Sequence, residues 1–569
     1  MTNILKRSLG KGMKYDNLIY ERPDYADVAK RIEKATQKIR NAQSREDFFA
    51  AVFEADAIKR ETDFAMFMMF SAYYHDATDA KAAEELAYIS AFDEKIDMTS
   101  FNEAILSSPF KKDYIEKYGD FLIRTLESEN RLKADGAEEM AREQELIIQY
   151  QSIKPSLNYK YRGKDISAGE LEVLMESSDR SVRIDARDAR DKAFLEKKDE
   201  IAAILDELIK LRDSYAKKNG FDNFLDYNNV KKGRFEYGEQ ELLDFCNLVK
   251  RELLPLEKRV RESLKKEMGL DKFTPYDDGV LPPGKEVHVT YDYNEMLDRM
   301  QKMYDDMDSD FGELLRTMRN NGYIDAAPSP NKTTGMAFTI MDAKNKSPYI
   351  FANCEPYSET VNELVHEFGH CIQHYLTENA LGLLSSNYMP QDLVEIPSKF
   401  MELMLLSHAD LFFGKEAVFY REKRLNTFLH EIIAFCMYAE IEHYLYTHVD
   451  ASFEERTAFV ENIKKEYYVG MDEPYTAYSK YGTWLLDNMP IFALPGYVIC
   501  YSLCDISAIF LAAIYNKNKE EGLRLYKKFC SLGRSLDYES AMNSIGLASA
   551  FKEESVRSVR DFFESAFLN

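Results

Sequence analysis

Three of the chain's nine histidines lie within one short segment, VNELVHEFGHCIQHYL, residues 361–376. The segment contains no proline and its pattern predicts a helix. On a helix, His366 and His370 are four positions apart, so both imidazoles project from one face at the spacing that two ligands of one Zn²⁺ need. Glu367 lies on the flank of that face, where it can act as a general base without being a ligand. This H-E-x-x-H pattern predicts one zinc ion per chain and metal-assisted hydrolysis of an amide bond.

A catalytic zinc site needs a third protein ligand and an open position. The residue six positions after His370 is Leu376, which excludes a third histidine at the metzincin spacing. The His374 side chain projects from a different direction around the helix axis than His366, so we expect a packing or supporting role for it. Glu395 and Glu402 are seven positions apart on one face of a predicted helix, so one can bind metal while the other orients a ligand imidazole. The carboxylates that qualify as third ligand are Glu378, Asp392, Glu395 and Glu402.

The elements around this segment are predicted to be mostly helices. Residues 185–218 carry apolar side chains at helical spacing, and Ser167 with Glu170 forms a capping-box pattern. Two β-type runs, GMAFTIM (335–341) and SPYIFAN (347–353), precede the histidine segment and predict a small hairpin. We expect the second run to pair with a peptide backbone by edge addition. The fold class is therefore mainly α, with a small β-sheet beside the zinc helix.

Composition restricts the partners of the chain. Its 569 residues include 98 acidic and 74 basic side chains, a net charge of -24, which argues against nucleic acid. The apolar run 497–515 is long enough to cross a membrane, but Asp505 at its centre favours a buried helix and no membrane partner. The first twenty residues lack the apolar region of a secretory signal. Seven cysteines without a C-x-x-C pattern suggest reduced thiols, so we expect a cytoplasmic protein. Its oligomeric state is left open.

The sequence around the zinc helix resembles a known family. H-E-F-G-H at 366–370, followed by Glu395 in E-I-P-S-K-F-M-E, resembles the oligoendopeptidase F branch of the thimet oligopeptidase-like zinc metallopeptidases. The similarity extends from about residue 155 to the end of the chain, and includes PYIFAN. It implies that His366, His370 and Glu395 hold the zinc and that Glu367 is the general base.

The resemblance also implies an architecture and a substrate. It implies a two-lobed helical body around a deep channel, with short peptides cut at internal bonds. We predict an N-terminal helical lobe over residues 1–190 and a catalytic zinc peptidase domain over residues 191–569.

One segment departs from the family pattern. Family members carry a histidine followed by aromatic residues, whereas this chain reads MPIFALPGYVICY at 489–501, with Pro490 or Ile491 in place of the histidine. Tyr497 and Tyr501 align with family tyrosines and are predicted to donate to the developing oxyanion.

Three functions are therefore compatible with the sequence. The first is a zinc-dependent endopeptidase that acts on short oligopeptides. The alternative is a peptide-binding protein that keeps zinc but has weak or absent turnover, which the altered 489–501 segment favours. A zinc hydrolase of non-peptide amides is the third.

Overall fold

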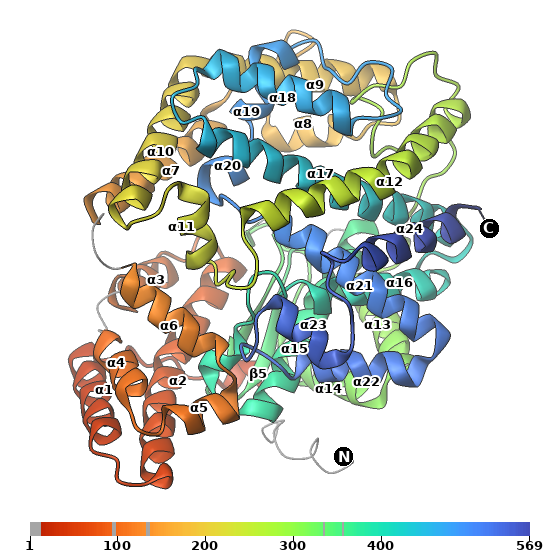
Figure 1. Ribbon diagram of the computed structural model, residues 1–569. Coiled ribbons are helices and arrows are strands. Elements are labelled where there is room, and N and C mark those ends of the chain that lie inside the picture. The colour runs from red at the N-terminus through yellow and green to blue at the C-terminus, as the bar shows by residue number, and fades with distance from the viewer. Residues whose placement is uncertain (1–12, 94–97, 133–136, 334–335, 355–357, 569) are drawn as a thin grey trace. The chain divides into compact units, whose positions relative to one another are not determined.

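The structure is a computed structural model that confirms a mainly α fold with small sheets (Figure 1). It describes residues 13–93, 98–132, 137–333, 336–354 and 358–568. The chain forms two compact units, each built from three chain segments. Unit 1 comprises residues 1–127, 287–417 and 511–547, and unit 2 comprises residues 128–286, 418–510 and 548–569. The boundaries of these units differ from those of the expected lobes, residues 1–190 and 191–569. The two lobes remain a prediction.

Unit 1 begins with a group of helices and continues with the elements around the histidine segment. Its helices are α1 (Tyr25–Arg40), α2 (Arg45–His75), α3 (Ala80–Asp93), α4 (Thr99–Ser107), α5 (Lys111–Tyr118), α6 (Phe121–Arg131), α13 (Tyr293–Met307), α14 (Ser309–Asn321), α15 (Ser358–Leu381), α16 (Ile396–Phe413), α22 (Lys519–Cys530) and α23 (Tyr538–Ile545). The first group packs around buried side chains of α2, α4 and α5, among them Phe48, Ile105 and Tyr114. Figure 1 shows the later group around α15.

A three-stranded sheet lies beside α15. Its strands are β3 (Ile324–Asp325), β4 (Phe338–Asp342) and β5 (Ser347–Phe351), in the order β3-β5-β4. β4 and β5 form the predicted antiparallel hairpin, with Ile340 opposite Tyr349. β5 is the central strand, because β3 pairs with it in parallel through Ile350 and Phe351. The expectation that the PYIFAN run offers a free edge is therefore wrong, and β4 is the edge strand next to the hairpin turn.

Helix α15 is held between the sheet and α16. Its apolar side chains Val365, Phe368 and Ile372 are completely buried, which fixes the rotation of the helix about its axis. Gly369 sits where α15 meets the start of α16: a Cβ there would lie 2.6 Å from the Cα of Ser398. The glycine of HEFGH is thus required by the close approach of two helices.

Unit 2 is also helical. Its elements are α7 (Ala137–Ser156), β1 (Tyr159–Tyr161), β2 (Lys164–Ile166), α8 (Ala168–Met175), α9 (Arg180–Leu195), α10 (Lys198–Lys218), α11 (Phe224–Lys231), α12 (Glu239–Glu267), α17 (Ala417–Thr447), α18 (Phe453–Tyr467), α19 (Thr483–Leu486), α20 (Met489–Ala493) and α24 (Glu553–Leu568). The predicted capping box of Ser167 and Glu170 is confirmed at the start of α8. The region 185–218, which carries apolar side chains at helical spacing, belongs to two helices, α9 and α10.

Helix α21 (Ile499–Lys517) contains the long apolar run. Within the described residues it is the one helix long and apolar enough to cross a bilayer, but 72% of that stretch is buried inside the protein. Asp505 is fully buried within it. This burial is that of a core helix, as predicted.

Candidate metal centre and active site

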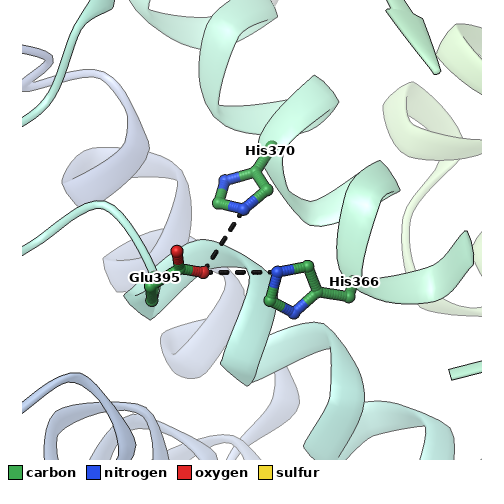
Figure 2. A group of neighbouring side chains, drawn as sticks. All are labelled: His366, His370 and Glu395. Atoms are coloured by element: carbon green, nitrogen blue, oxygen red, sulfur yellow. Dashed lines mark ion pairs between the residues drawn. The ribbon is translucent and has the colours of Figure 1, made fainter. Parts of the chain in front are cut away.

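Two histidines of α15 face the same way, as their spacing predicts. The ring centroids of His366 and His370 are 5.0 Å apart. The two side chains are 20% and 14% exposed to solvent, respectively. Because the apolar faces of α15 are buried against the sheet and α16, the remaining face presents both rings together. Each ring turns its Nε2 toward the same point (Figure 2).

Glu395 supplies the third donor from the start of α16. Its Oε2 lies 3.2 Å from His366 Nε2 and 3.4 Å from His370 Nε2 (Figure 2). Zinc with N and O ligands near 2.0–2.1 Å in a tetrahedral arrangement needs donors about 3.4 Å apart, so this set fits the metal. The Ser398 hydroxyl lies 3.0 Å from Glu395 Oε2 and 2.9 Å from the Glu395 carbonyl oxygen, which fixes the carboxylate at the helix start.

Glu402 contacts one of the donor residues, His366, and does not itself belong to the donor group. Its Oε1 is 2.7 Å from His366 Nδ1, and its Oε2 accepts a hydrogen bond from Asn362 at 3.2 Å. A carboxylate on Nδ1 leaves Nε2 as the atom that can bind metal, and it fixes the ring orientation. The two carboxylates therefore differ in the imidazole nitrogens that they contact. Glu395 lies close to Nε2 of both imidazoles, the nitrogens available to a metal, whereas Glu402 contacts Nδ1 of His366.

The charges of this group are strongly coupled. Burial by itself lowers the pKa of His366, but hydrogen bonds to Glu395 and Glu402 outweigh it and raise this pKa to about 10. Burial also opposes ionisation of Glu395, yet the imidazoles of His370 and His366 hold its pKa well below the usual range. Glu395 is therefore anionic, the form that binds a cation, while metal binding must release the proton from His366.

Glu367 has a partner that the sequence did not indicate. The residue is 7% exposed, and its carboxylate Oε2 lies 2.7 Å from the hydroxyl of Thr339 on β4. The same hydroxyl lies 2.9 Å from the carbonyl oxygen of Glu367. The sequence predicted the strand, but which of its side chains faces the helix depends on the register of β4 against β5 and on the rotation of α15.

The remaining candidates in this region have other partners. Glu378 accepts hydrogen bonds from Arg60 at 3.0–3.1 Å and pairs with Lys346, so it joins α15 to α2 and to the hairpin turn. Asp392 is buried and is not part of the donor group. Burial lowers the pKa of His374 to about 3, so this imidazole is neutral.

The segment that departs from the family pattern belongs to unit 2. Tyr497 and Tyr501 lie with their hydroxyls 3.4 Å apart, and both are half-buried. Ile491 is buried in α20, whereas Pro490 is partly exposed. The predicted role of the two tyrosines toward the donor group of unit 1 stays a prediction.

The turn before Tyr497 is held by polar side chains. Glu442 accepts the Gly496 N–H at 2.8 Å, and Arg234 donates to the Gly496 carbonyl at 2.8 Å. Asn228 donates to the Pro495 carbonyl at 3.0 Å. Gly496 has φ +65°, and a Cβ there would lie 2.7 Å from Asn228 Nδ2, so only glycine fits this turn.

A second group of potential metal ligands lies in unit 2, formed by Glu257, Asp278 and His430. Arg261 Nη2 lies 2.9 Å from Glu257, 2.8 Å from Asp278 and 3.1 Å from His430 Nδ1. A guanidinium nitrogen therefore already occupies the position of a cation, and this group is an internal ion-pair network.

The chain matches known families over most of its length. The model of "Peptidase family M3" matches residues 173–561, and that of a "Peptidase M3 N-terminal domain" matches residues 15–132. Oligopeptidase PepF of Bacillus subtilis (strain 168) is 27% identical over 292 residues, which are 50% of this chain and 42% of that protein. The matches to curated relatives thus cover less than two thirds of those proteins' own lengths.

Solved structures extend the comparison to the whole chain. A structure described as an oligoendopeptidase F has a TM-score of 0.86 at 25% identity, with 97% of this chain and 98% of that one covered. PZ peptidase A with an inhibitor shares the fold at a TM-score of 0.85 and 24% identity, over 97% of this chain and 99% of that one. With the family model matching residues 173–561 and the fold shared along the chain, this protein belongs to peptidase family M3, among its oligoendopeptidase F-type members.

Proposed function

We propose that the chain is a zinc-dependent endopeptidase that hydrolyses internal bonds of short peptides. The observation that carries the proposal is the convergence of two imidazole Nε2 atoms and Glu395 Oε2 beside Glu367, in a member of a peptidase family. The relatives named oligopeptidases support short peptides as the substrate class. The closed channel that would exclude folded proteins rests on the family resemblance.

His366, His370 and Glu395 would hold the metal, one ion per chain. When bound, zinc supplies Lewis-acid polarisation of the scissile carbonyl and lowers the pKa of water. Glu402 keeps the His366 ring oriented with Nε2 toward the ion.

Glu367 moves the protons of the reaction. As the water oxygen attacks the carbonyl carbon, the Glu367 carboxylate accepts a proton from that water. It then passes this proton to the nitrogen of the leaving amine, and the carbon–nitrogen bond breaks to give a carboxylate and an amine. The Thr339 hydroxyl, 2.7 Å from Glu367 Oε2, keeps the carboxylate in one orientation.

Strand β4 is the element that we expect to receive the peptide backbone. In the part of the chain that the structure describes, β4 pairs with β5 on one side only. Its residues Phe338 to Met341 are partly exposed. An extended peptide added at this edge would run past the strand that carries Thr339.

Tyr497 and Tyr501 are the proposed donors to the carbonyl oxygen during attack. The turn fixed by Glu442, Arg234 and Asn228 supports this role, because a donor is effective only when it is held in place. We also propose a cytoplasmic location, which the seven buried cysteines support.

Metal removal and one substitution test the proposal. Purified protein should contain about one zinc per chain, and a chelator should abolish cleavage of a synthetic peptide library read by mass spectrometry. Glu367→Gln should keep its zinc and lose turnover by about 10²–10⁴-fold, because only the proton acceptor is removed. Full activity in protein shown to be free of metal would contradict the proposal.

The altered segment favours one alternative, a peptide-binding protein with weak or absent turnover. Neither Pro490 nor Ile491 can donate a side-chain hydrogen bond. The same library separates the functions: a binding protein retains peptides without cutting them, whereas the proposed enzyme yields internal cleavage products. A hydrolase of non-peptide amides would neither retain nor cut them.

A further inference from the structure

Glu363 lies on the face of α15 that carries the donor histidines. Successive helix residues are about 100° apart around the axis, so Glu363 falls about 20° from His370 and about 40° from Glu367. It is about 6 Å nearer the start of the helix than Glu367. Its neighbours Leu364 and Val365 are completely buried, whereas the Glu363 side chain is exposed. An extended peptide advances about 3.3 Å per residue, so the residues beside a bond held at the donor group are within side-chain reach of this carboxylate.

Glu363 differs from the acidic residues one turn before it and one turn after it. Glu367 Oε2 lies 2.7 Å from the Thr339 hydroxyl, and Glu359 accepts a hydrogen bond from the Ser358 hydroxyl at 2.8 Å. Within the described parts of the chain, Glu363 has no hydrogen bond or ion pair. The carboxylate between two partnered ones is therefore the one whose acceptor sites are open to a ligand.

The charges around Glu363 favour a cation as that ligand. Surrounding protein atoms shield the side chain partly from water, and Glu367 and then Glu359 repel a negative charge there, so the pKa of Glu363 is raised. The attraction of His366 does not offset these effects. A positive group placed against Glu363 would relieve the repulsion between the carboxylates, whereas an anion would add to it.

We propose that Glu363 selects peptides with a positive charge beside the cleaved bond, by pairing its carboxylate with an ammonium or guanidinium group of the substrate. Peptides offer this charge from two sources, the side chains of lysine and arginine and the N-terminal amine. The position of Glu363 on the same helix face as His366, His370 and Glu367 ties this recognition to the donor group itself. The inference rests on the proposed peptidase function and assigns one determinant of its substrate preference.

The test starts from one library peptide that is cut at a single known bond. It is remade with blocked ends and with one lysine, in turn, at each position on either side of that bond. Each lysine peptide has a matched acetyl-lysine peptide, which keeps a long side chain and removes its charge. A second series begins at these positions with a free or an acetylated N-terminus, and so reports the amine as the source.

A preference for the charged peptide is the expected result. At about pH 7, where carboxylates and amines are ionised, kcat/KM of the native chain should be about 3- to 20-fold higher for the charged member of one pair, mostly through KM. Glu363→Gln should bring this ratio close to one. The ratio cancels any effect of the substitution on zinc or on Glu367, because both peptides are cut at the same site. Glu363→Lys should reverse the preference, so that a glutamate peptide is cut faster than its glutamine partner.

Glu359→Gln is the matched control, since it removes an equal charge from the same helix, one turn farther from Glu367. It should retain the preference of the native chain. An equal loss of preference in Glu359→Gln and Glu363→Gln would show a diffuse negative field instead of a contact, and would overturn the inference. A native ratio near one for every pair, or a preference that persists in Glu363→Gln, would also overturn it. Thermal unfolding shows whether each variant is folded.

Binding separates this inference from the proposed function. Calorimetric titration of the same peptide pairs into Glu367→Gln protein needs no turnover. A preference for the charged peptide that disappears when Glu363→Gln is added to that protein supports the recognition even if the native chain cleaves nothing. Cleavage by the native chain without any such preference sinks the recognition alone.

Discussion

Two carboxylates, Glu395 directly before α16 and Glu402 within it, differ in what they touch. Glu395 meets both imidazoles at Nε2, whereas Glu402 meets His366 at Nδ1. Loss of a ligand removes a bond to the metal, while loss of a supporting carboxylate weakens ligand orientation and basicity. The contacts of Glu395 and Glu402 thus distinguish a ligand position from a supporting position. The sequence alone, in which the two residues are seven positions apart on one helix face, could not say which residue takes which position.

Alanine substitutions of Glu402 and Glu395 should lower the affinity for zinc to different extents. Glu402→Ala should weaken zinc binding by about 10- to 100-fold. Glu395→Ala should weaken it further. Competition with a chelator of known affinity measures both. Glu378→Ala is a useful contrast, because Arg60 loses one of its two carboxylate partners and keeps Asp56, so the fold should be destabilised by about 1–3 kcal/mol while the donor group stays intact. Normal zinc binding in Glu395→Ala with loss in Glu378→Ala would show that the wrong ligand was chosen.

In the proposed mechanism, the Thr339 hydroxyl positions Glu367, the proposed general base. Thr339→Val keeps the shape of the side chain and removes the hydrogen bond to Glu367, so kcat should fall by about 10-fold or more while KM and zinc content change little. Thr339→Ser restores the hydroxyl and should recover most of the activity. Steady-state kinetics on one peptide from the library measures all three proteins. A serine variant as slow as the valine variant would point to packing, not positioning.

At the scale of elements, the site depends on how closely two helices approach. The three donors come from α15 and from the start of α16, and Gly369 lies at their contact. Ser398 and Pro397 of α16 fill the space where a side chain on Gly369 would lie, with the Pro397 carbonyl oxygen 2.8 Å from the position of a Cβ. The distance between the helices therefore sets the distance between the imidazoles and Glu395.

Gly369→Ala should separate these helices. We expect a loss of folding stability of about 1–3 kcal/mol from overpacking, and weaker zinc binding because Glu395 moves away from the histidines. Gly169→Ala in α8 is the control: nothing lies within 4 Å of its added Cβ, so it should be neutral or stabilising by about 0.5–1 kcal/mol. Denaturant unfolding and zinc competition measure the pair. If Gly369→Ala and Gly169→Ala had the same stability and zinc affinity, the close approach of α15 and α16 would not explain why residue 369 is a glycine.

At the scale of the whole molecule, each compact unit draws on three separated parts of the chain. Unit 1 joins α2 to α15 through Arg60 and Glu378, which are more than three hundred positions apart. A fragment that begins at residue 191 would leave Glu378 without that partner. Each unit therefore needs segments that are far apart in the sequence, and a single cut cannot isolate either unit.

One buried carboxyl makes global stability depend on pH. Burial raises the pKa of Glu442 from an ordinary 4.5 to about 7, against the opposing hydrogen bond from Gly496. Between these values the folded state holds a proton that the unfolded chain has lost. The contribution of Glu442 to stability is therefore fully present below pH 4.5 and is lost as pH rises through 7.

Glu442→Gln removes this titration and keeps an oxygen that can accept the Gly496 N–H. The free energy of unfolding of the native chain relative to the variant should fall between pH 4.5 and 7, by about 3 kcal/mol at most. Urea unfolding followed by fluorescence of Trp484, the single tryptophan and a residue of unit 2, measures the difference. A difference that is independent of pH would show that Glu442 does not titrate in this range.

The sequence by itself determined the local features. Periodicity and spacing predicted helix α15 with its paired imidazoles, the hairpin of β4 and β5, and a short list of carboxylates that contained both Glu395 and Glu402. These features depend on residues a few positions apart, which one helix or one hairpin brings together.

Only the tertiary structure decided the rest. Which carboxylate meets the imidazoles, why Gly369 is a glycine, and that Thr339 reaches Glu367 all depend on contacts between different elements. The edge strand was predicted wrongly because β3, two residues long, pairs with β5 and carries no signal of its own. Local spacing fixes which side chains share a face, and packing fixes what that face meets.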